Sequence, residues 1–563
     1  MDATATASPQ PAAPAPTTPR WHRRPALWLA LATLLCLAPF AHKAVHIDDY
    51  LFLRAARQIL LTPADPFGTT VHWYDSPMPL AAVTQNPPGA SYLLASAGAL
   101  FGWSETALHL VFFATAVCAV LGVHRLAQRF CPQPALAALL ALITPVFWVS
   151  ATTLMSDIPM LALWLWSLEF WLRGLDRRRH RWFALAATLI ALAGLTKYFA
   201  AALLPLLLVY TFVRERRPSL PLLWLLLPAT ALVAYDRHTA ALYGHGLLSG
   251  ATDYVRLTAR PGALWQRSVI LFAFLGGCLL PVLFLAPRLL PRRVLATAGG
   301  VALAILAALT FATNLGDYSL AADAPSRWWV IGQAALLAAG GALVLGLVVS
   351  DLRADRTADG LLLSLWAGGT VVFAGVVNWS INGRSLLPLA PVVAILVVRA
   401  LARRSAEPLA WRRLWPLIPA VAIAAAVVRA DAVFAADSRT TARLFHEQLA
   451  GRPATLWFQG HWGFQYYMEA GGARPLDKRN PQARPGDYLV TPENNTNLSR
   501  VPLEVFEPAG TIAIERPFGF VTSNRDAGAG FYADTIGPLP FALSPAREER
   551  FVLSRMRPPY FWP

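Results

Sequence analysis

Two adjacent carboxylates are the first residues in the chain whose types could do acid–base chemistry. They lie in the segment His46-Ile47-Asp48-Asp49-Tyr50, directly after an apolar run. A carboxylate beside a bound hydroxyl or amine can remove its proton as a general base. On a helix two neighbouring side chains point about 100° apart, so only one of this pair can face a given pocket. A solvated loop or a helix cap is the alternative explanation for the pair.

Amides and a third carboxylate follow farther along the chain. Gln85 and Asn86 precede two prolines, Pro87 and Pro88. Because proline fixes its own φ and cannot donate a backbone hydrogen bond, the two prolines predict a rigid corner that presents both amides. Asp157 opens a later apolar run, so its carboxylate is expected at the end of a helix. These residues, with His46, are candidates for substrate binding.

Two isolated cations complete the set of candidate residues. Lys197 stands in Gly-Leu-Thr-Lys-Tyr, next to Tyr198, and Arg384 stands in Asn-Gly-Arg-Ser-Leu-Leu-Pro. Arginine binds phosphate through two parallel hydrogen bonds, and lysine acts on phosphate as a point charge. Both cations are therefore candidate phosphate ligands. The alternative is that each side chain only extends to the membrane–water interface.

The composition shows what must position these residues. Of 563 residues 56% are hydrophobic and 14% are charged, whereas a soluble domain carries about 25% charged residues. Runs such as Trp265–Ala286 and Trp328–Val349 are long enough to cross a hydrocarbon core of about 30 Å. The net charge of +16 comes from arginine clusters in every second loop, which is the positive-inside pattern. The charge therefore indicates topology and argues against nucleic-acid binding.

The hydrophobic runs predict an all-α polytopic membrane protein of about thirteen spans. The charge pattern places the N-terminus in the cytoplasm and the C-terminal segment outside. All the candidate residues then lie on the external face, where basic residues are scarce. The expected spans are roughly 25–41, 104–124, 133–150, 153–172, 182–195, 197–213, 219–235, 265–286, 294–313, 328–349, 361–378, 385–401 and 413–430.

Three parts of the chain are expected to differ in organisation. Residues 1–24 are rich in Pro, Ala and Thr and predict a disordered cytoplasmic tail. Residues 25–430 form the membrane domain, whose first external loop, 42–103, contains the apolar stretch Gly89–Trp103, which predicts a helix in the membrane interface. Residues 431–563 have ordinary polarity and predict a small extracytoplasmic α/β domain, with a helix at Thr440–Ala450 and strands at Thr455–Phe458 and Tyr488–Val490. Aromatic residues between Trp457 and Tyr467 are expected in its core, with stacking on sugar rings as the alternative.

These motifs together resemble bacterial glycosyltransferases of the GT-C superfamily, specifically the protein O-mannosyltransferase-like group that includes the lipid A aminoarabinose transferases. The resemblance rests on the acidic pair, the Pro-Pro corner, Ser-Asp-x-Pro, Gly-Leu-Thr-Lys-Tyr and Gly-Arg-x-Leu-Leu-Pro, in this order, across residues 25–430. It implies a multi-pass protein of the bacterial inner membrane that transfers a sugar from a polyprenyl-phosphate donor to an extracytoplasmic acceptor. The family's catalytic base is an external-loop aspartate, which implies Asp48 first and Asp49 second. Inversion at the sugar's anomeric carbon is likewise implied by the resemblance.

Some features depart from that pattern or leave alternatives open. The aminoarabinose transferases have lysine where this chain has Asn86. No firm metal site is visible, although His42 and His46 with Asp48 could hold a divalent cation. Asp253 and Asp317 are weaker candidates on the acceptor side. A lipid-linked glycan polymerase or ligase, and a polytopic transporter or flippase, are the rival functions.

Overall fold

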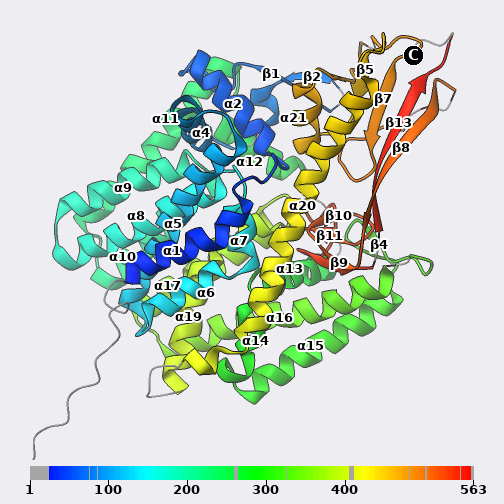
Figure 1. The fold of residues 1–563 in the computed structure, drawn as a ribbon. Helices are drawn as coiled ribbons and strands as arrows, with labels where there is room; N and C mark the ends of the chain where they lie inside the picture. Colours follow the sequence, from blue (N-terminus) through cyan, green and yellow to red (C-terminus); the bar gives the residue numbers. More distant parts are fainter. Residues whose placement is uncertain are drawn as a thin grey trace, which may run out of the picture.

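The computed structural model describes residues 25–74, 76–84, 86–258, 264–324, 326–404, 411–480, 482–500, 502, 504–545 and 547–558. The expected cytoplasmic tail, 1–24, and the candidate residue Gln85 lie outside the described residues. Most of the described chain is helical, and a small sheet region lies near the C-terminus (Figure 1).

Seven of the described helices are long and apolar enough to cross a membrane. Two of the seven begin with a 3₁₀ turn, and one ends in a π-helical turn. These seven are α5 (Glu105–Phe130), η3 with α10 (Tyr198–Ala202, Leu203–Glu215), η4 with α11 (Leu220–Leu225, Leu226–Tyr243), α15 (Arg292–Phe311), α16 (Arg327–Ala354), α17 with η5 (Ala358–Val372, Phe373–Val377) and α20 (Leu417–Leu449).

Two further pairs of apolar helices are bent at a short break. Helices α6 (Pro134–Leu142) and α7 (Pro145–Ala151) are bent by 67°, and α13 (Leu264–Cys278) and α14 (Pro281–Leu289) by 87°. Each second helix starts with a proline, which starts a helix well but cannot continue one. With these pairs counted as single spans, the described part of the chain has up to nine candidate spans.

The remaining expected spans also coincide with helices. These are α1 (Pro25–Leu37) with the 3₁₀ turn η2 (Ala38–Phe40), α8 (Asp157–Arg177), α9 (His180–Gly194), and α19 (Leu389–Arg404) after the short α18 (Gly383–Leu386). Thirteen crossings therefore remain a prediction. The stretch expected in the interface forms α4 (Gly89–Phe101), whose 13 residues extend over about 20 Å, too short to cross the hydrocarbon core.

The C-terminal tail contains a five-stranded sheet of order β6-β5-β7-β13-β8. The expected strands are present as β5 (Leu456–Phe458) and β7 (Tyr488–Pro492), and these two pair in parallel. Antiparallel β13 (Arg547–Met556) joins β7 to β8 (Phe506–Arg516), and β6 (Arg474–Pro475) forms the other edge. Helix α21 (Trp462–Ala470) packs on α20 and on α2 (Asp49–Leu61). The expected helix Thr440–Ala450 is the end of α20, which runs unbroken past residue 430.

A second part of the tail returns to the helices of the membrane domain. It carries β9 (Gly519–Val521), β10 (Ser523–Asn524), β11 (Ala529–Gly530) and β12 (Ala542–Ser544), which lie beside α20 below the sheet in Figure 1. Its buried Phe531 and Leu539 belong to the main hydrophobic core. Residues 519–544 therefore pack as part of the helical body, although in sequence they are inserted between β8 and β13 of the sheet.

Candidate functional site

The two carboxylates of the first external loop have different environments. Asp48 and Asp49 lie where the loop enters α2, after Ile47, whose φ of 46° is unusual for a β-branched residue. The Asp49 side chain is fully buried, and its two oxygens accept the backbone N–H groups of Leu154 (2.9 Å) and His46 (3.0 Å). Burial is the largest influence on Asp49 and raises the pKa of its carboxyl to about 7. Asp49 thus ties the loop to the segment after α7.

Asp48 is more accessible than Asp49. Its side chain is 27% exposed, and Oδ2 accepts a hydrogen bond of 3.1 Å from Nη2 of Arg384. Arg384 lies on α18, where the Asn382 side chain caps the helix by accepting the N–H of Ser385 at 2.8 Å. Of the two carboxylates, Asp48 is therefore the one that faces the predicted phosphate-binding cation.

A second ion pair extends this arrangement. Asp157 starts α8, where a negative charge is favoured by the helix dipole, and only 1% of its side chain is exposed. Lys197 donates a hydrogen bond to Asp157 Oδ1, and Arg384 Nη1 lies 3.9 Å from Oδ2. Asp48, Arg384, Asp157 and Lys197 thus form one chain of alternating charges, called here the cavity cluster.

Asn86 lines a cavity beside the cavity cluster, next to a close approach between the start of α4 and the end of α9. The N–H of Gly89 donates to the Leu195 carbonyl at 2.9 Å, and a Cβ on Gly89 would lie 2.5 Å from Oγ1 of Thr196. This contact holds the Pro-Pro corner against the segment that leads into Lys197. The cavity beside the cluster measures about 350 Å³ and is lined by Asn86, Lys197, Tyr198 and Arg384 at its polar end.

The same cavity becomes apolar farther from the charges. Phe199, Phe373 and Val377 line both this cavity and a neighbouring one of about 360 Å³. The neighbouring cavity lies between α10 and α17 and is otherwise lined largely by hydrophobic side chains such as Trp366 and Leu206. The arrangement suits an amphipathic ligand with an anionic head and a hydrocarbon chain.

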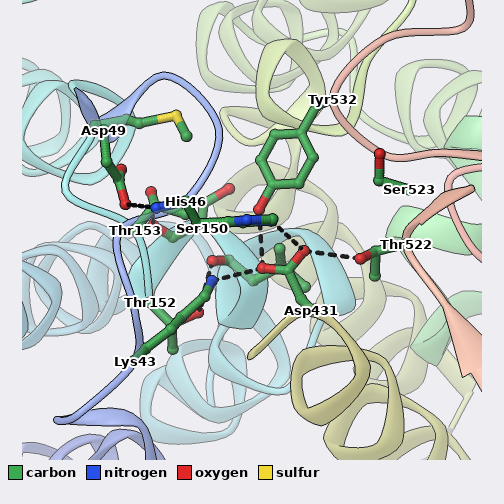
Figure 2. Close-up of polar contacts among 12 residues, drawn as sticks. Lys43, His46, Asp49, Ser150, Thr152, Thr153, Asp431, Thr522, Ser523 and Tyr532 are labelled. Carbon is green, nitrogen blue, oxygen red and sulfur yellow. Dashed lines mark hydrogen bonds and ion pairs between the residues drawn. The ribbon is translucent and has the colours of Figure 1, made fainter. Parts of the chain in front are cut away.

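His46, expected beside the substrate, lies in a different cluster around Asp431 of α20 (Figure 2). Asp431 is fully buried and accepts from Lys43 Nζ (2.5 Å), Thr522 Oγ1 (2.8 Å) and Tyr532 Oη (2.9 Å), while His46 Nε2 lies 3.3 Å away. Lys43 also donates to Thr152 at 3.3 Å. Lys43, His46, Asp431, Thr522 and Tyr532 are called here the buried cluster.

The two clusters meet at one side chain. The Tyr532 ring lies between the clusters, 5.7 Å from the Arg384 guanidinium carbon and 5.3 Å from the His46 ring. Burial lowers the pKa of His46, an effect that Asp431 opposes, and burial raises the pKa of the Tyr532 hydroxyl well above its usual value. The buried cluster therefore holds the 43–49 loop and the returning tail in fixed positions around Arg384.

Sequence reasoning missed Asp431, Thr522 and Tyr532. One signal was available, because a carboxylate within a helix long enough to span a membrane is costly unless it is paired. Nothing in the local sequence around Thr522 and Tyr532 indicates that this part of the tail returns to the first loop.

The remaining expected residues lie apart from the cavity cluster. Asp253 on α12 (Leu247–Thr258) is exposed and pairs with Arg256 at 3.7 Å, while Asp317 lines a separate cavity near the tail. His42 Nδ1 lies 2.7 Å from Thr106 Oγ1. Among the described residues, no three His, Cys, Asp or Glu side chains are grouped so that they could hold a metal ion.

Comparisons with known proteins agree with this architecture. The family model described as "Dolichyl-phosphate-mannose-protein mannosyltransferase" matches residues 85–236. The structure of ArnT from Cupriavidus metallidurans bound to undecaprenyl phosphate is 14% identical, with a TM-score of 0.50 over 84% of this chain and 93% of that chain. The oligosaccharyltransferase of Archaeoglobus fulgidus, tethered to an acceptor peptide, is 14% identical, with a TM-score of 0.46 over 84% of this chain and 69% of that one. No curated protein matches the sequence.

Proposed function

We propose that the chain is a membrane glycosyltransferase of the GT-C superfamily, and that it transfers a sugar from a polyprenyl-phosphate donor to an extracytoplasmic acceptor. The family-model match over residues 85–236 and the fold similarity to ArnT support this proposal. In this proposal Arg384 and Lys197 bind the donor phosphate, Asp48 is the general base, and Asn86, Tyr198 and Asp157 complete the binding site. The protein is a multi-pass protein of the bacterial inner membrane, with the site on its outer face.

The observation that carries the donor proposal is the pair of neighbouring cavities, which share Phe199, Phe373 and Val377 in their linings. The polar end holds Lys197 and Arg384, and the apolar part continues between α10 and α17. A polyprenyl phosphate has the same division, with a charged phosphate at one end of a long hydrocarbon. The similar ArnT structure contains undecaprenyl phosphate, which supports this class of donor.

Donor binding exchanges partners within the cavity cluster. Within the chain itself Arg384 pairs with Asp48, and Lys197 pairs with Asp157. A phosphate between the two cations competes with these carboxylates, because phosphate oxygens are strong acceptors for Arg and Lys. Asp48 is thereby released from Arg384 and becomes available to the acceptor.

The reaction then needs only one proton acceptor and a stabilised leaving group. Asp48 removes the proton from the acceptor hydroxyl or amine, whose lone pair attacks the anomeric carbon as the bond from that carbon to the phosphate oxygen breaks. The polyprenyl phosphate leaves with the electron pair, and Arg384 and Lys197 stabilise its developing charge. A single displacement of this kind inverts the anomeric centre. Asp49 fits the role of base less well because it is fully buried and both its oxygens bind backbone N–H groups.

The proposed sugar transfer can be tested in cells. Mass spectrometry of envelope glycans and glycolipids from cells with and without the gene reports both the sugar and the acceptor. We expect one sugar to be lost from one class of acceptor, to return with the wild-type gene and to remain absent with Asp48→Asn. Identical glycans in both strains, or full restoration by Asp48→Asn, would reject the proposal.

A further inference from the structure

A second polar cavity lies on the tail side of the candidate site. It has a volume of about 450 Å³, within the range of small-molecule sites. Its walls come from the loop after β7, the β10–β11 turn, strand β13 and the turn between β3 (Asn314–Leu315) and β4 (Tyr318–Ser319). With Trp462 and with Thr535 and Ile536, side chains from six separate parts of the chain surround one space, and all of these parts are predicted to lie outside the membrane.

The wall of this cavity is held in place by hydrogen bonds among its own polar groups. Asn494 donates to the Ser523 carbonyl (2.9 Å) and to Glu549 (3.1 Å), and Asn524 donates to Glu549 at 3.0 Å. The Asn495 side chain accepts the N–H of His461 at 2.7 Å. These bonds fix the walls, while the side chains of Asp526 and Glu548 are exposed at the cavity.

The cavity adjoins both segments that carry the reaction residues. Trp462, which lines it, precedes Gly463, and a Cβ on Gly463 would lie 2.0 Å from the Val45 carbonyl oxygen, three residues before Asp48. On the other side, Thr535 lines the cavity next to Asp534, which accepts the N–H of Ile381 at 3.2 Å, three residues before Arg384. The cavity lining is thus connected, through Gly463 and Asp534, to the backbone segments that carry Asp48 and Arg384.

The lining chemistry suits a carbohydrate. Amides and carboxylates in the lining offer the donors and acceptors that the hydroxyl groups of a sugar need. Five carboxylates line the cavity against two arginines, Arg525 and Arg550. This excess of negative charge opposes an acceptor that carries phosphate or carboxylate groups. A divalent cation fits less well, because no three of the described carboxylates are close enough together to hold one.

We propose that this cavity binds the acceptor, and that the acceptor is an oligosaccharide without acidic groups, either neutral or amine-bearing. The inference rests on the proposed function, since it names the molecule that receives the sugar. The donor then enters from the membrane side, next to Lys197, and the acceptor glycan from the tail side, next to Trp462. In this proposal the two substrates meet at Asp48.

The test is a glycan array probed with the full-length chain in lipid nanodiscs. The array carries bacterial surface oligosaccharides of three classes, which are neutral, amine-bearing and anionic. We expect binding to neutral or amine-bearing members and about tenfold weaker binding to anionic ones. An array with no neutral or amine-bearing ligand, or with equal binding to anionic glycans, would overturn the inference.

Two variants and one control assign the binding to this cavity. The double variant Asp526→Lys/Glu548→Lys reverses two exposed charges and should weaken binding of amine-bearing glycans about tenfold. Asn497→Gly removes a lining side chain at a φ of 56° that glycine tolerates, and it should weaken binding without a charge change. The control Glu447→Lys reverses an exposed charge on α20 away from the cavity and should leave binding unchanged. If both cavity variants bind as the wild type does, the site is elsewhere.

A parallel measurement separates this inference from the proposed function. Thermal unfolding of the wild-type chain with and without undecaprenyl phosphate reports donor-site binding. Stabilisation by the lipid without any glycan binding would reject the acceptor cavity and leave the donor proposal intact. Glycan binding without lipid stabilisation would reject the donor proposal and leave a glycan-binding site.

Discussion

The cavity cluster and the buried cluster both contain carboxylates paired with cations, but they differ in how completely their partners satisfy them. Asp431 is fully buried and has four side-chain partners. Asp48 is 27% exposed and accepts a hydrogen bond of 3.1 Å from Arg384, which lines a cavity. A buried carboxylate whose oxygens are paired with several side chains stabilises the fold. A partly exposed carboxylate can still accept a hydrogen bond from a ligand.

The largest expected effect separates Asp48 from Asp49. Asp48→Asn removes the proposed base and should lower the rate of sugar transfer by about 10²–10⁴-fold, while the protein still binds donor. Turnover and donor affinity are measured on the purified chain in nanodiscs. The matched variant Asp49→Asn should lower turnover much less. Equal losses of turnover in the two variants would contradict the assignment of Asp48 alone as the base.

The next effect is on stability and belongs to the buried cluster. Asp431→Ala leaves Lys43 buried without its counter-charge, which should lower the free energy of unfolding by about 3–5 kcal/mol. Thermal unfolding in nanodiscs, with yield of monodisperse protein as a second measure, reports this loss. Asp48→Asn should unfold at nearly the wild-type temperature. If it is as unstable as Asp431→Ala, the distinction between the clusters fails.

A smaller effect concerns the donor. Arg384→Ala should raise the apparent donor KM about tenfold, because a cation–phosphate contact is lost. Arg384→Lys keeps the charge but cannot form two parallel hydrogen bonds to the phosphate. Its donor KM should therefore lie between those of the wild type and the alanine variant. An unchanged donor KM with full activity in both variants would show that Arg384 does not bind the donor phosphate.

Tyr532→Phe weakens the link between the clusters with the least change in shape. It removes one of the hydrogen bonds to Asp431 and should cost about 1 kcal/mol of stability, while the ring remains over Arg384. The donor KM should therefore stay near the wild-type value. A large rise in KM with unchanged stability would assign the Tyr532 hydroxyl to the donor site instead of the buried cluster.

A pH dependence of stability is also expected from Asp49. Burial raises the pKa of Asp49 to about 7 from a usual value near 3.8, so the folded chain binds this proton more tightly than the unfolded chain does. The stability that Asp49 contributes is then greatest below pH 4 and declines as pH rises toward 7. Unfolding temperatures at pH 5 and pH 8 should differ more in the wild type than in Asp49→Asn; the same difference in both would exclude this titration.

The sequence indicated the candidate site residues that lie on the membrane domain, and it did not indicate the residues that the tail supplies. Lys197 and Arg384 stood out because isolated cations are rare at the external ends of spans, and the structure brings them to one cavity with Asn86. His46 was expected beside the substrate, but its ring contacts Asp431. That contact depends on a pairing across nearly the whole chain, for which local patterns carry no information.

The helices, too, were only partly predicted from the sequence. Apolar runs indicated where helices form, yet they did not indicate the bends at Pro145 and Pro281, because a continuous apolar run hides a break in its hydrogen bonding. The tail's sheet was expected from its strands, whereas the return of residues 519–544 to the helices follows from burial of side chains such as Phe531 and Leu539. Such burial is a property of the assembled fold.

The most direct test of the account is a donor-bound structure of the Asp48→Asn variant, in nanodiscs, with a sugar-loaded undecaprenyl phosphate. The proposed mechanism predicts that the phosphate contacts both Arg384 and Lys197, and that the lipid chain runs between α10 and α17. It also predicts that the substituted side chain at position 48 faces the anomeric carbon opposite the phosphate. A phosphate bound away from both cations, or a side chain at position 48 that is remote from the sugar, would contradict it.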